Sequence, residues 1–226
     1  MVKALLFDLD GTLYDRDGAV AELFAAQHRK FEAELGGLPV AHFVERMLEL
    51  DQHGHADKRT AYGVLVREQG LQDALADRLV QSHREISPHV GELFPDALVT
   101  LGALQQRGLA LGLISNGRVD TQGAKLRRLG LERFFSALLI SEAEGVRKPD
   151  RRIFERALQR LGVSADQAWF VGDHPVADVA GAHAAGLTAV WRYVPYWSEP
   201  ATRAFTIFSL SELLGRLADT APRAGG

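Results

Sequence analysis

The chain has 226 residues, no cysteine and a formal net charge of −3 at pH 7. Its length exceeds the ~100–150 residues of a typical domain, which favours one large domain carrying a smaller inserted one. The lack of cysteine excludes disulfides, thiolate metal sites and a cysteine nucleophile. The slightly acidic charge gives no general attraction to nucleic acid, so we expect a small soluble molecule as the partner and predict no particular oligomeric state.

The first apolar run, residues 4–7, is short, and the carboxylates of Asp8 and Asp10 follow it. This run is shorter than the apolar region of a secretory signal peptide. No later apolar run in the sequence has the length needed to cross a bilayer. We therefore expect a cytoplasmic protein with no membrane partner.

Short apolar runs alternate with segments of helical periodicity along most of the chain. The predicted strands are residues 4–7, 109–114, 137–140, 168–171 and 188–191, and the predicted helices are residues 96–107, 121–129, 151–161 and 175–185. Asp150 is a predicted helix N-cap, and a glycine follows each of these helices, as Gly162 does. This alternation predicts an α/β fold built on a doubly wound parallel sheet.

Residues 18–87 interrupt this alternation with consecutive amphipathic segments. The predicted helices of this insertion are residues 20–35, 40–50, 58–69 and 71–85. We interpret the segment as an inserted helical domain that turns about hinges at residues 15–18 and 87–95 and closes over a substrate. Residues 1–17 and 88–220 then form the core domain, and residues 221–226 are predicted to be a disordered tail.

Asp8 and Asp10 follow the first predicted strand two residues apart, which places both carboxylates on one side of the extended chain. Ligands of open α/β sheets bind at the carboxyl ends of strands. Gly11 allows a sharp turn and a close approach to an anion. The alternative is that the two aspartates only end a strand and begin a turn.

Polar groups also follow the second predicted strand and precede a later helix. Ser115, Asn116 and Gly117 offer a hydroxyl, an amide and a backbone N–H to phosphate oxygens, although the same residues are common in simple turns. Lys148 precedes a helix whose first turn contains arginines, which leaves a positive end for an anion. The alternative for Lys148 is a solvated surface lysine.

Two more carboxylates, Asp173 and Asp178, follow the strand predicted at residues 168–171. Hard oxygen ligands in this position suit Mg²⁺. Asp178 has the alternative role of an ordinary acid in the first turn of a helix.

These four segments, in this order and spacing between Lys3 and Trp191, resemble the four motifs of the haloacid dehalogenase superfamily, which consists mainly of phosphatases. The resemblance implies a Rossmann-like core with a helical cap inserted between the first two motifs. It also implies Mg²⁺-dependent hydrolysis of a small phosphate monoester through a phosphoaspartyl intermediate. Ala177 departs from the pattern, because many relatives have asparagine there.

The resemblance implies a role for each matched residue. Asp8 matches the nucleophile, Asp10 the acid and base, and Lys148 the cation that neutralises both nucleophile and phosphate. Close to other negative groups, Asp10 should be easier to protonate than a free aspartate. The implied substrate-binding residues are Thr12, Ser115, Asn116 and Gly117. The implied metal ligands are Asp8, Asp10 through its carbonyl, and Asp173, with Asp178 supporting the site.

Three alternatives remain open within and beyond this family. A dehalogenase would need neither Asp10 nor Asp173, and a phosphomutase would have a cap signature after Leu13 that is missing here. A non-catalytic scaffold would tolerate the loss of a core acid, whereas every core acid is present.

Two groups of residues outside these motifs also stand out in the sequence. Asp51, His53, His55 and Asp57 lack the spacing of a metal site, so we interpret them as a solvated loop, or alternatively as a contact with the leaving group. The aromatic residues at 191–197 suggest packing or a subunit contact.

Overall fold

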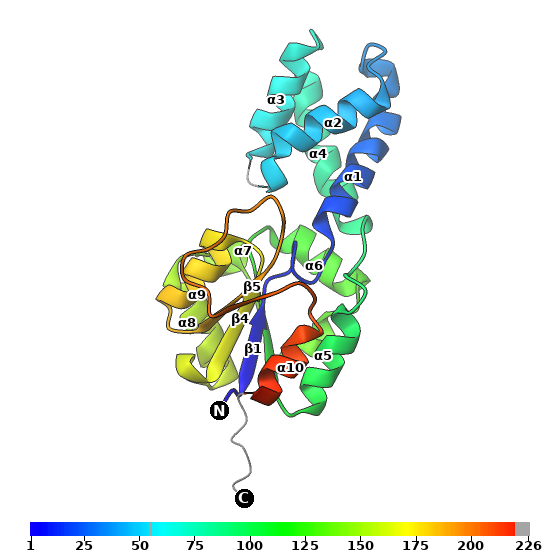
Figure 1. Ribbon diagram of the computed structural model, residues 1–226. Helices are drawn as coiled ribbons and strands as arrows, with labels where there is room; N and C mark the ends of the chain where they lie inside the picture. The colour runs from blue at the N-terminus through cyan, green and yellow to red at the C-terminus, as the bar shows by residue number, and fades with distance from the viewer. Residues whose placement is uncertain (55, 220–226) are drawn as a thin grey trace, which may run out of the picture. The chain divides into compact units, whose positions relative to one another are not determined.

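The computed structural model describes residues 1–54 and 56–219, which divide into two compact units. One unit combines Met1–Asp15 with the chain from Leu93 onward, and the other is Arg16–Glu92 (Figure 1). The predicted disordered tail at residues 221–226 lies outside the described residues. That residues 18–87 close over a substrate as a cap stays a prediction.

A parallel sheet of six strands in the described residues forms the centre of the first unit, in the order β3-β2-β1-β4-β5-β6. The strands are β1 (Ala4–Phe7), β2 (Ala110–Ser115), β3 (Ala137–Ile140), β4 (Ala168–Gly172), β5 (Thr188–Arg192) and β6 (Phe205–Ile207). Ala4 of β1 pairs with Ala110 on one side and Ala168 on the other. All four residues of β1 are apolar and fully buried, as is usual for a central strand of a parallel sheet that has helices on both faces. The predicted fold class is confirmed.

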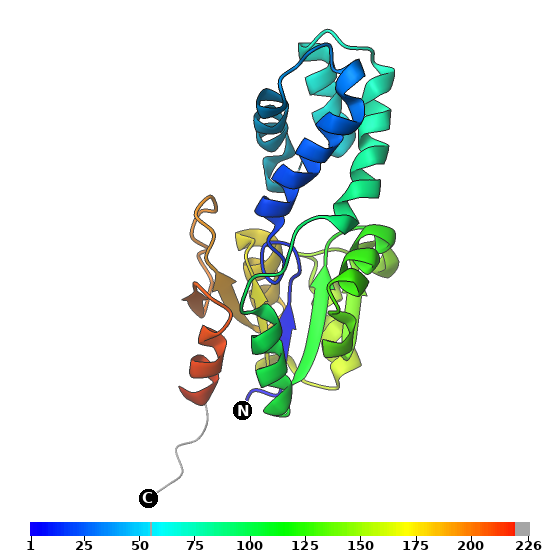
Figure 2. The same cartoon turned by 90° about the vertical axis from the view of Figure 1, so that its right-hand side faces the viewer.

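Helices cover both faces of this sheet. They are α5 (Ala97–Gln106), α6 (Val119–Arg128), α7 (Ser141–Glu144), α8 (Arg151–Leu161), α9 (Gly181–Ala184) and α10 (Glu212–Asp219). Helix α8 packs on β2, β3 and α9, whereas α5 packs on β2 and lies beside α10 (Figure 2). The strand order reverses its direction at β1 and β4, so the carboxyl ends of these two strands form the crevice where such sheets bind ligands.

The core differs from the predicted elements at β6, at the helix predicted over residues 175–185, and at α7 and α10, which were not predicted. Strand β6 was not predicted, because its three residues give too short an apolar run and it is defined by pairing with β5. The helix predicted at residues 175–185 is a π-helix, Pro175–Ala180, followed by α9. Asp178 lies within this π-helix. It is 1% exposed, and its carboxylate accepts a hydrogen bond from the backbone N–H of His174 at 3.0 Å.

The second unit is a bundle of antiparallel helices (Figure 1). They are α1 (Arg16–Phe31), α2 (Val40–Asp51), α3 (Lys58–Glu68) and α4 (Ala74–Ile86), with short 3₁₀ turns at Glu32–Glu34, Gln52–Gly54 and Ser87–His89. Phe24, Phe43 and Tyr62 are fully buried between the helices. The hydroxyl of Tyr62 donates to Oε1 of Gln27 at 2.5 Å, so these two buried polar side chains satisfy each other.

A buried ion pair joins three helices of this unit. Asp51 is 1% exposed, and its carboxylate accepts from Nη2 of Arg16 and from Nζ of Lys58, both at 2.5 Å. The expectation of a solvated loop is therefore wrong for Asp51. Arg16 also begins α1, so the hinge predicted at residues 15–18 is mostly helix.

The remaining residues of that predicted loop have ordinary local roles. Asp57 is the N-cap of α3 and accepts from the backbone N–H of Thr60 at 2.9 Å. His53 has a positive φ of 53° and lies 4.0 Å from the carboxylate of Asp17. His55 lies outside the described residues. Contact of this loop with a leaving group stays a prediction.

We predict that Asp51→Asn lowers the free energy of unfolding by about 2–4 kcal/mol, because Arg16 and Lys58 lose the charge that offsets their desolvation. Burial raises the pKa of Asp51, but the two cations outweigh this effect and hold the pKa below its ordinary value. The stabilisation is therefore present above the unfolded pKa of ~4 and is lost as pH falls through the lower folded value. Urea denaturation at pH 7 and in acid measures both effects.

The matched control is Asp77→Asn, which removes an exposed partner of Arg59. It should change stability much less than Asp51→Asn, because exposed ion pairs contribute little. Equal effects of the two substitutions, or a loss at Asp51 that persists unchanged in acid, would contradict this interpretation of the ion pair.

Candidate active site

The site begins where β1 and β4 end. The backbone N–H of Asp8 donates to the carbonyl of Val171 at 2.9 Å, so Asp8 continues the sheet for one more residue. Gly11 then turns the chain with a φ of +84°, and a Cβ at this position would lie 2.6 Å from Oδ2 of Asp173. Glycine is required here both for its backbone conformation and for the space that Asp173 occupies.

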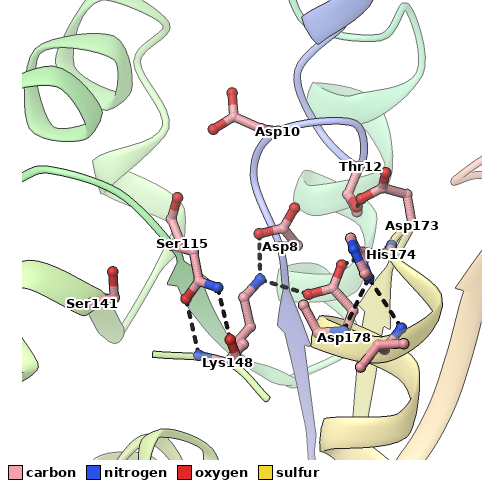
Figure 3. Close-up of polar contacts among 12 residues, drawn as sticks. Asp8, Asp10, Thr12, Ser115, Ser141, Lys148, Asp173, His174 and Asp178 are labelled. Carbon is pink, nitrogen blue, oxygen red and sulfur yellow. Dashed lines mark hydrogen bonds and ion pairs between the residues drawn. The ribbon is translucent and has the colours of Figure 1, made fainter. Parts of the chain in front are cut away.

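Four buried charged residues meet at this edge, and we call them the carboxylate–lysine cluster: Asp8, Lys148, Asp173 and Asp178 (Figure 3). Nζ of Lys148 lies 2.5 Å from Oδ1 of Asp8 and 2.6 Å from Oδ1 of Asp178. Asp8, Asp173 and Asp178 each offer an oxygen within 4.8 Å of the others. Lys148 is 3% exposed, so it is not a solvated surface lysine.

The pKa values of the cluster reflect its burial first and the closeness of its carboxylates second. Burial, and then the neighbouring carboxylates, raise the pKa of Asp8 well above its ordinary value despite the opposing effect of Lys148. Burial and Asp178 raise the pKa of Asp173 to about 7. Burial alone would lower the pKa of Lys148, but Asp178 and Asp8 outweigh it and raise that pKa. Lys148 is therefore charged, and the cluster has room electrostatically for a further cation.

The side chain of Asn116 holds the backbone of Lys148. Its Oδ1 accepts from the Lys148 N–H, and its Nδ2 donates to the Lys148 carbonyl, both at 3.0 Å. The backbone N–H of Gly117 donates to Oγ of Ser141 at 3.0 Å. The Asn116 amide and the Gly117 N–H, which were predicted to bind phosphate, thus form hydrogen bonds within the protein.

Helix α6 supplies contacts to Asp10 that the sequence analysis missed. Nζ of Lys125 lies 2.5 Å from Oδ1 of Asp10, and Nε2 of Gln122 donates to Oδ2 at 2.6 Å. The same Nε2 donates to Oγ of Ser115 at 2.8 Å. In Figure 3 the carboxylate of Asp10 lies apart from the carboxylate–lysine cluster. The expected easier protonation of Asp10 rested on negative neighbours alone, whereas its carboxylate contacts the cation of Lys125. The three-residue spacing of Gln122 and Lys125 predicts one shared helix face.

Asp173 is held by residues from distant parts of the chain. The indole N–H of Trp197 donates to Oδ2 of Asp173 at 3.1 Å, and that of Trp191 donates to its carbonyl at 2.7 Å. The hydroxyl of Thr12 donates to Oδ1 at 3.5 Å, and Thr12 is fully buried. The ring centroid of Trp197 lies 4.6 Å from that of His174. Part of the predicted aromatic cluster therefore orients a carboxylate of the site.

Asp178 lies in the first turn of the π-helix but does not behave as a solvated helix acid, because it is buried against Lys148. A Cβ on Gly172 would lie 2.4 Å from the Cβ of Asp178, so glycine at the end of β4 makes room for it. His174 accepts from the N–H groups of Val176 and Ala177 at 3.0 Å through Nδ1, which fixes its ring.

Within residues 1–54 and 56–219, no helix is long and apolar enough to cross a membrane.

The chain is similar to known proteins over most of its length. The family model of haloacid dehalogenase-like hydrolases matches residues 2–186. A glyceraldehyde 3-phosphate phosphatase of Methanothermobacter thermautotrophicus is 33% identical over 203 residues, covering 84% of this chain and 85% of the relative.

Two crystal structures resemble the chain over nearly its whole length. One is a putative hydrolase of the same family from Bacillus subtilis, bound to magnesium, which is 27% identical with a TM-score of 0.79 and covers 96% of this chain and 98% of its own. The other is a 2-haloacid dehalogenase of Pseudomonas syringae, which is 32% identical with a TM-score of 0.66 and covers 98% and 100%.

We predict that Gly11→Ala weakens the stabilisation of the protein by added divalent cations, because the new Cβ displaces the carboxylate of Asp173. Gly108→Ala is the matched control, since Gly108 also has a positive φ, +76°, but no neighbouring atom lies within 4 Å of a Cβ added there. Both variants should lose about 1–2 kcal/mol from backbone strain. Thermal denaturation with and without Mg²⁺ separates the two effects, and an equal response to the cation in both variants would contradict the prediction.

Proposed function

This chain belongs to the family of haloacid dehalogenase-like hydrolases, and we propose that it hydrolyses a small phosphate monoester through a phosphoaspartyl intermediate on Asp8. It is a phosphatase, in common with its curated relative. The observation that carries the proposal is the contact of the Asp8 carboxylate with Lys148 beside two further buried acids. A buried ammonium beside a nucleophile lets a carboxylate approach a phosphate dianion, which it would otherwise repel.

Mg²⁺ is the proposed cofactor. Asp8, Asp173 and Asp178 offer hard oxygen ligands close together, and burial together with the neighbouring carboxylates raises the pKa values of Asp8 and Asp173. We propose Asp8, Asp173 and the carbonyl of Asp10 as the ligands, with Asp178 in support because it also pairs with Lys148. The ion would supply Lewis-acid neutralisation of the phosphate.

In the proposed reaction, an oxygen of Asp8 attacks the phosphorus, and the bond to the leaving oxygen breaks. The leaving oxygen takes a proton from Asp10, and the phosphoryl group remains on Asp8. Water then attacks the phosphorus and gives a proton to Asp10, which releases phosphate and restores the Asp8 carboxylate. Lys148 stays in contact with Asp8 and offsets the charge of the phosphoryl group, and Ser115 orients its oxygens.

The resemblance to a 2-haloacid dehalogenase leaves carbon–halogen cleavage as the second candidate. In that reaction a halide leaves without a proton and no cation is needed. Here Asp10 is held by two side chains and Asp173 by three groups, so the structure maintains both acids that a dehalogenase would not use. These contacts support the phosphatase proposal.

The substrate proposal is a small phosphate ester. The relative from Methanothermobacter is named for a three-carbon ester, which belongs in any test panel. Selection among esters would come from the proposed cap, residues 18–87, closing over the site. A cytoplasmic location and the absence of a nucleic-acid partner are part of the same proposal.

We predict that Asp8→Asn lowers kcat on phosphate monoesters by at least about a thousandfold, because an amide is a poor nucleophile. Circular dichroism should show an unchanged fold. Phosphate release across a panel of monoesters, which includes glyceraldehyde 3-phosphate, measures the effect. Substantial turnover by Asp8→Asn would refute the nucleophile assignment.

We also predict that EDTA abolishes turnover and that Mg²⁺ restores it. Asp173→Asn should raise the half-saturating Mg²⁺ concentration at least about tenfold, since it removes a charged ligand. Asp166→Asn is the control, because Asp166 is exposed in the 3₁₀ turn Ala165–Gln167, before β4. Release of halide from a 2-haloacid in EDTA, without phosphatase activity, would instead support the dehalogenase alternative.

A further inference from the structure

Helix α6 turns two polar side chains toward the site. Gln122 and Lys125 are each 4% exposed, whereas Arg127 and Arg128 of the same helix are exposed. Lysine is seldom buried to this degree without a specific partner, because desolvating an ammonium is costly. Neither residue belongs to the segments that carry the family resemblance, so their burial calls for its own explanation.

Lys125 is fixed on two sides. Its Nζ lies 2.5 Å from Oδ1 of Asp10 and 4.3 Å from the ring centroid of Tyr14, which is itself buried. The carbonyl of Tyr14 accepts from the N–H of Gly11 at 2.9 Å, so the ring belongs to the same turn that presents Asp10. A cation between a carboxylate and an aromatic face has little freedom to swing into solvent.

Gln122 connects Asp10 to the proposed phosphate-binding hydroxyl. One amide nitrogen donates both to Oδ2 of Asp10 and to Oγ of Ser115. The opposite amide orientation would place Oε1 against the carboxylate, so Asp10 selects the observed one. In this orientation the buried Oε1 has no hydrogen-bond partner among the described residues. Buried polar atoms without a hydrogen-bond partner are rare in proteins, because leaving one unpaired destabilises the fold. The two hydrogen bonds of the amide nitrogen therefore determine the orientation of Gln122.

Gly117 makes space for this bridge. A Cβ at that position would lie 2.8 Å from Cγ and 3.0 Å from Nε2 of Gln122. The loop after β2 and the helix that follows it are therefore packed so that the Gln122 amide reaches both Ser115 and Asp10. With Lys125 on the other oxygen, both oxygens of the Asp10 carboxylate are engaged by α6.

We propose that Lys125 and Gln122 are positioning residues that fix the carboxylate of Asp10 relative to Ser115. The inference rests on the proposed function, in which Ser115 binds the phosphate and Asp10 protonates the leaving oxygen. A phosphate bound at Ser115 then presents its leaving oxygen at a set distance from Asp10. Misplacing Asp10 slows transfer of the phosphoryl group to Asp8 only for substrates whose leaving group needs the proton, whereas hydrolysis of the phosphoaspartate is slowed alike for every substrate.

The test compares two esters that differ in leaving group. Glycerol phosphate releases an alkoxide that needs a proton, whereas para-nitrophenyl phosphate releases a stable phenolate. Lys125→Met keeps the length of the stem and removes the charge. We expect kcat/KM, which reports transfer of the phosphoryl group to Asp8, to fall on the order of a hundredfold for glycerol phosphate and by less than about tenfold for para-nitrophenyl phosphate.

Further variants separate positioning from structure. Gln122→Ala removes the amide bridge and should show the same dependence on leaving group. It therefore provides a second test in case Lys125→Met folds poorly. Lys125→Arg should recover part of the lost activity. Arg127→Met, on the exposed face of α6, should leave both rates unchanged. In an Asp10→Asn background, Lys125→Met should add little further loss, because the group that it positions is already gone.

Equal losses of kcat/KM on both esters in Lys125→Met and Gln122→Ala, or the full Lys125→Met effect in the Asp10→Asn background, would overturn the inference. Asp8→Asn is assayed in parallel on para-nitrophenyl phosphate. If Asp8→Asn is inactive while the Lys125 effects are equal on both esters, only the inference fails. If Asp8→Asn is active, the proposed function fails first.

Discussion

The charge balance around Lys148 is the constraint on which the site depends. Three carboxylates from the ends of β1 and β4 are buried together, and one ammonium touches two of them. Unpaired, such charges would cost far more than the marginal stability of a protein allows. Lys148 offsets part of the negative charge of the three carboxylates, and the proposed divalent cation would offset the rest.

The surrounding residues keep each charge in position. Asn116 holds the backbone of Lys148, Trp197 holds the carboxylate of Asp173, and α6 holds that of Asp10. These contacts come from loops and helices that the sheet brings to one edge, so the sheet provides a rigid frame and the loops provide chemistry. A site of this kind is preorganised, since little needs to move when charge develops during the reaction.

The sequence alone predicts those secondary-structure elements and site carboxylates that depend on neighbouring residues in the chain. Strand runs, the Asp150 cap and the spacing of Asp8 and Asp10 depend on near neighbours, and the structure contains each of these features. The contacts of Lys125 with Asp10 and of Trp197 with Asp173 join segments far apart in the chain, so no local pattern reveals them. The burial of Asp51 was missed for the same reason, because its partners lie on two other helices.

The central claim is that Asp8 carries the phosphoryl group. Acid quenching of the enzyme during turnover of para-nitrophenyl phosphate with Mg²⁺, followed by mass spectrometry of the peptide that contains Asp8, tests it most directly. The account predicts a phosphoryl group on Asp8 that appears only with substrate and is missing in Asp8→Asn. A phosphoryl group on any other residue would contradict it.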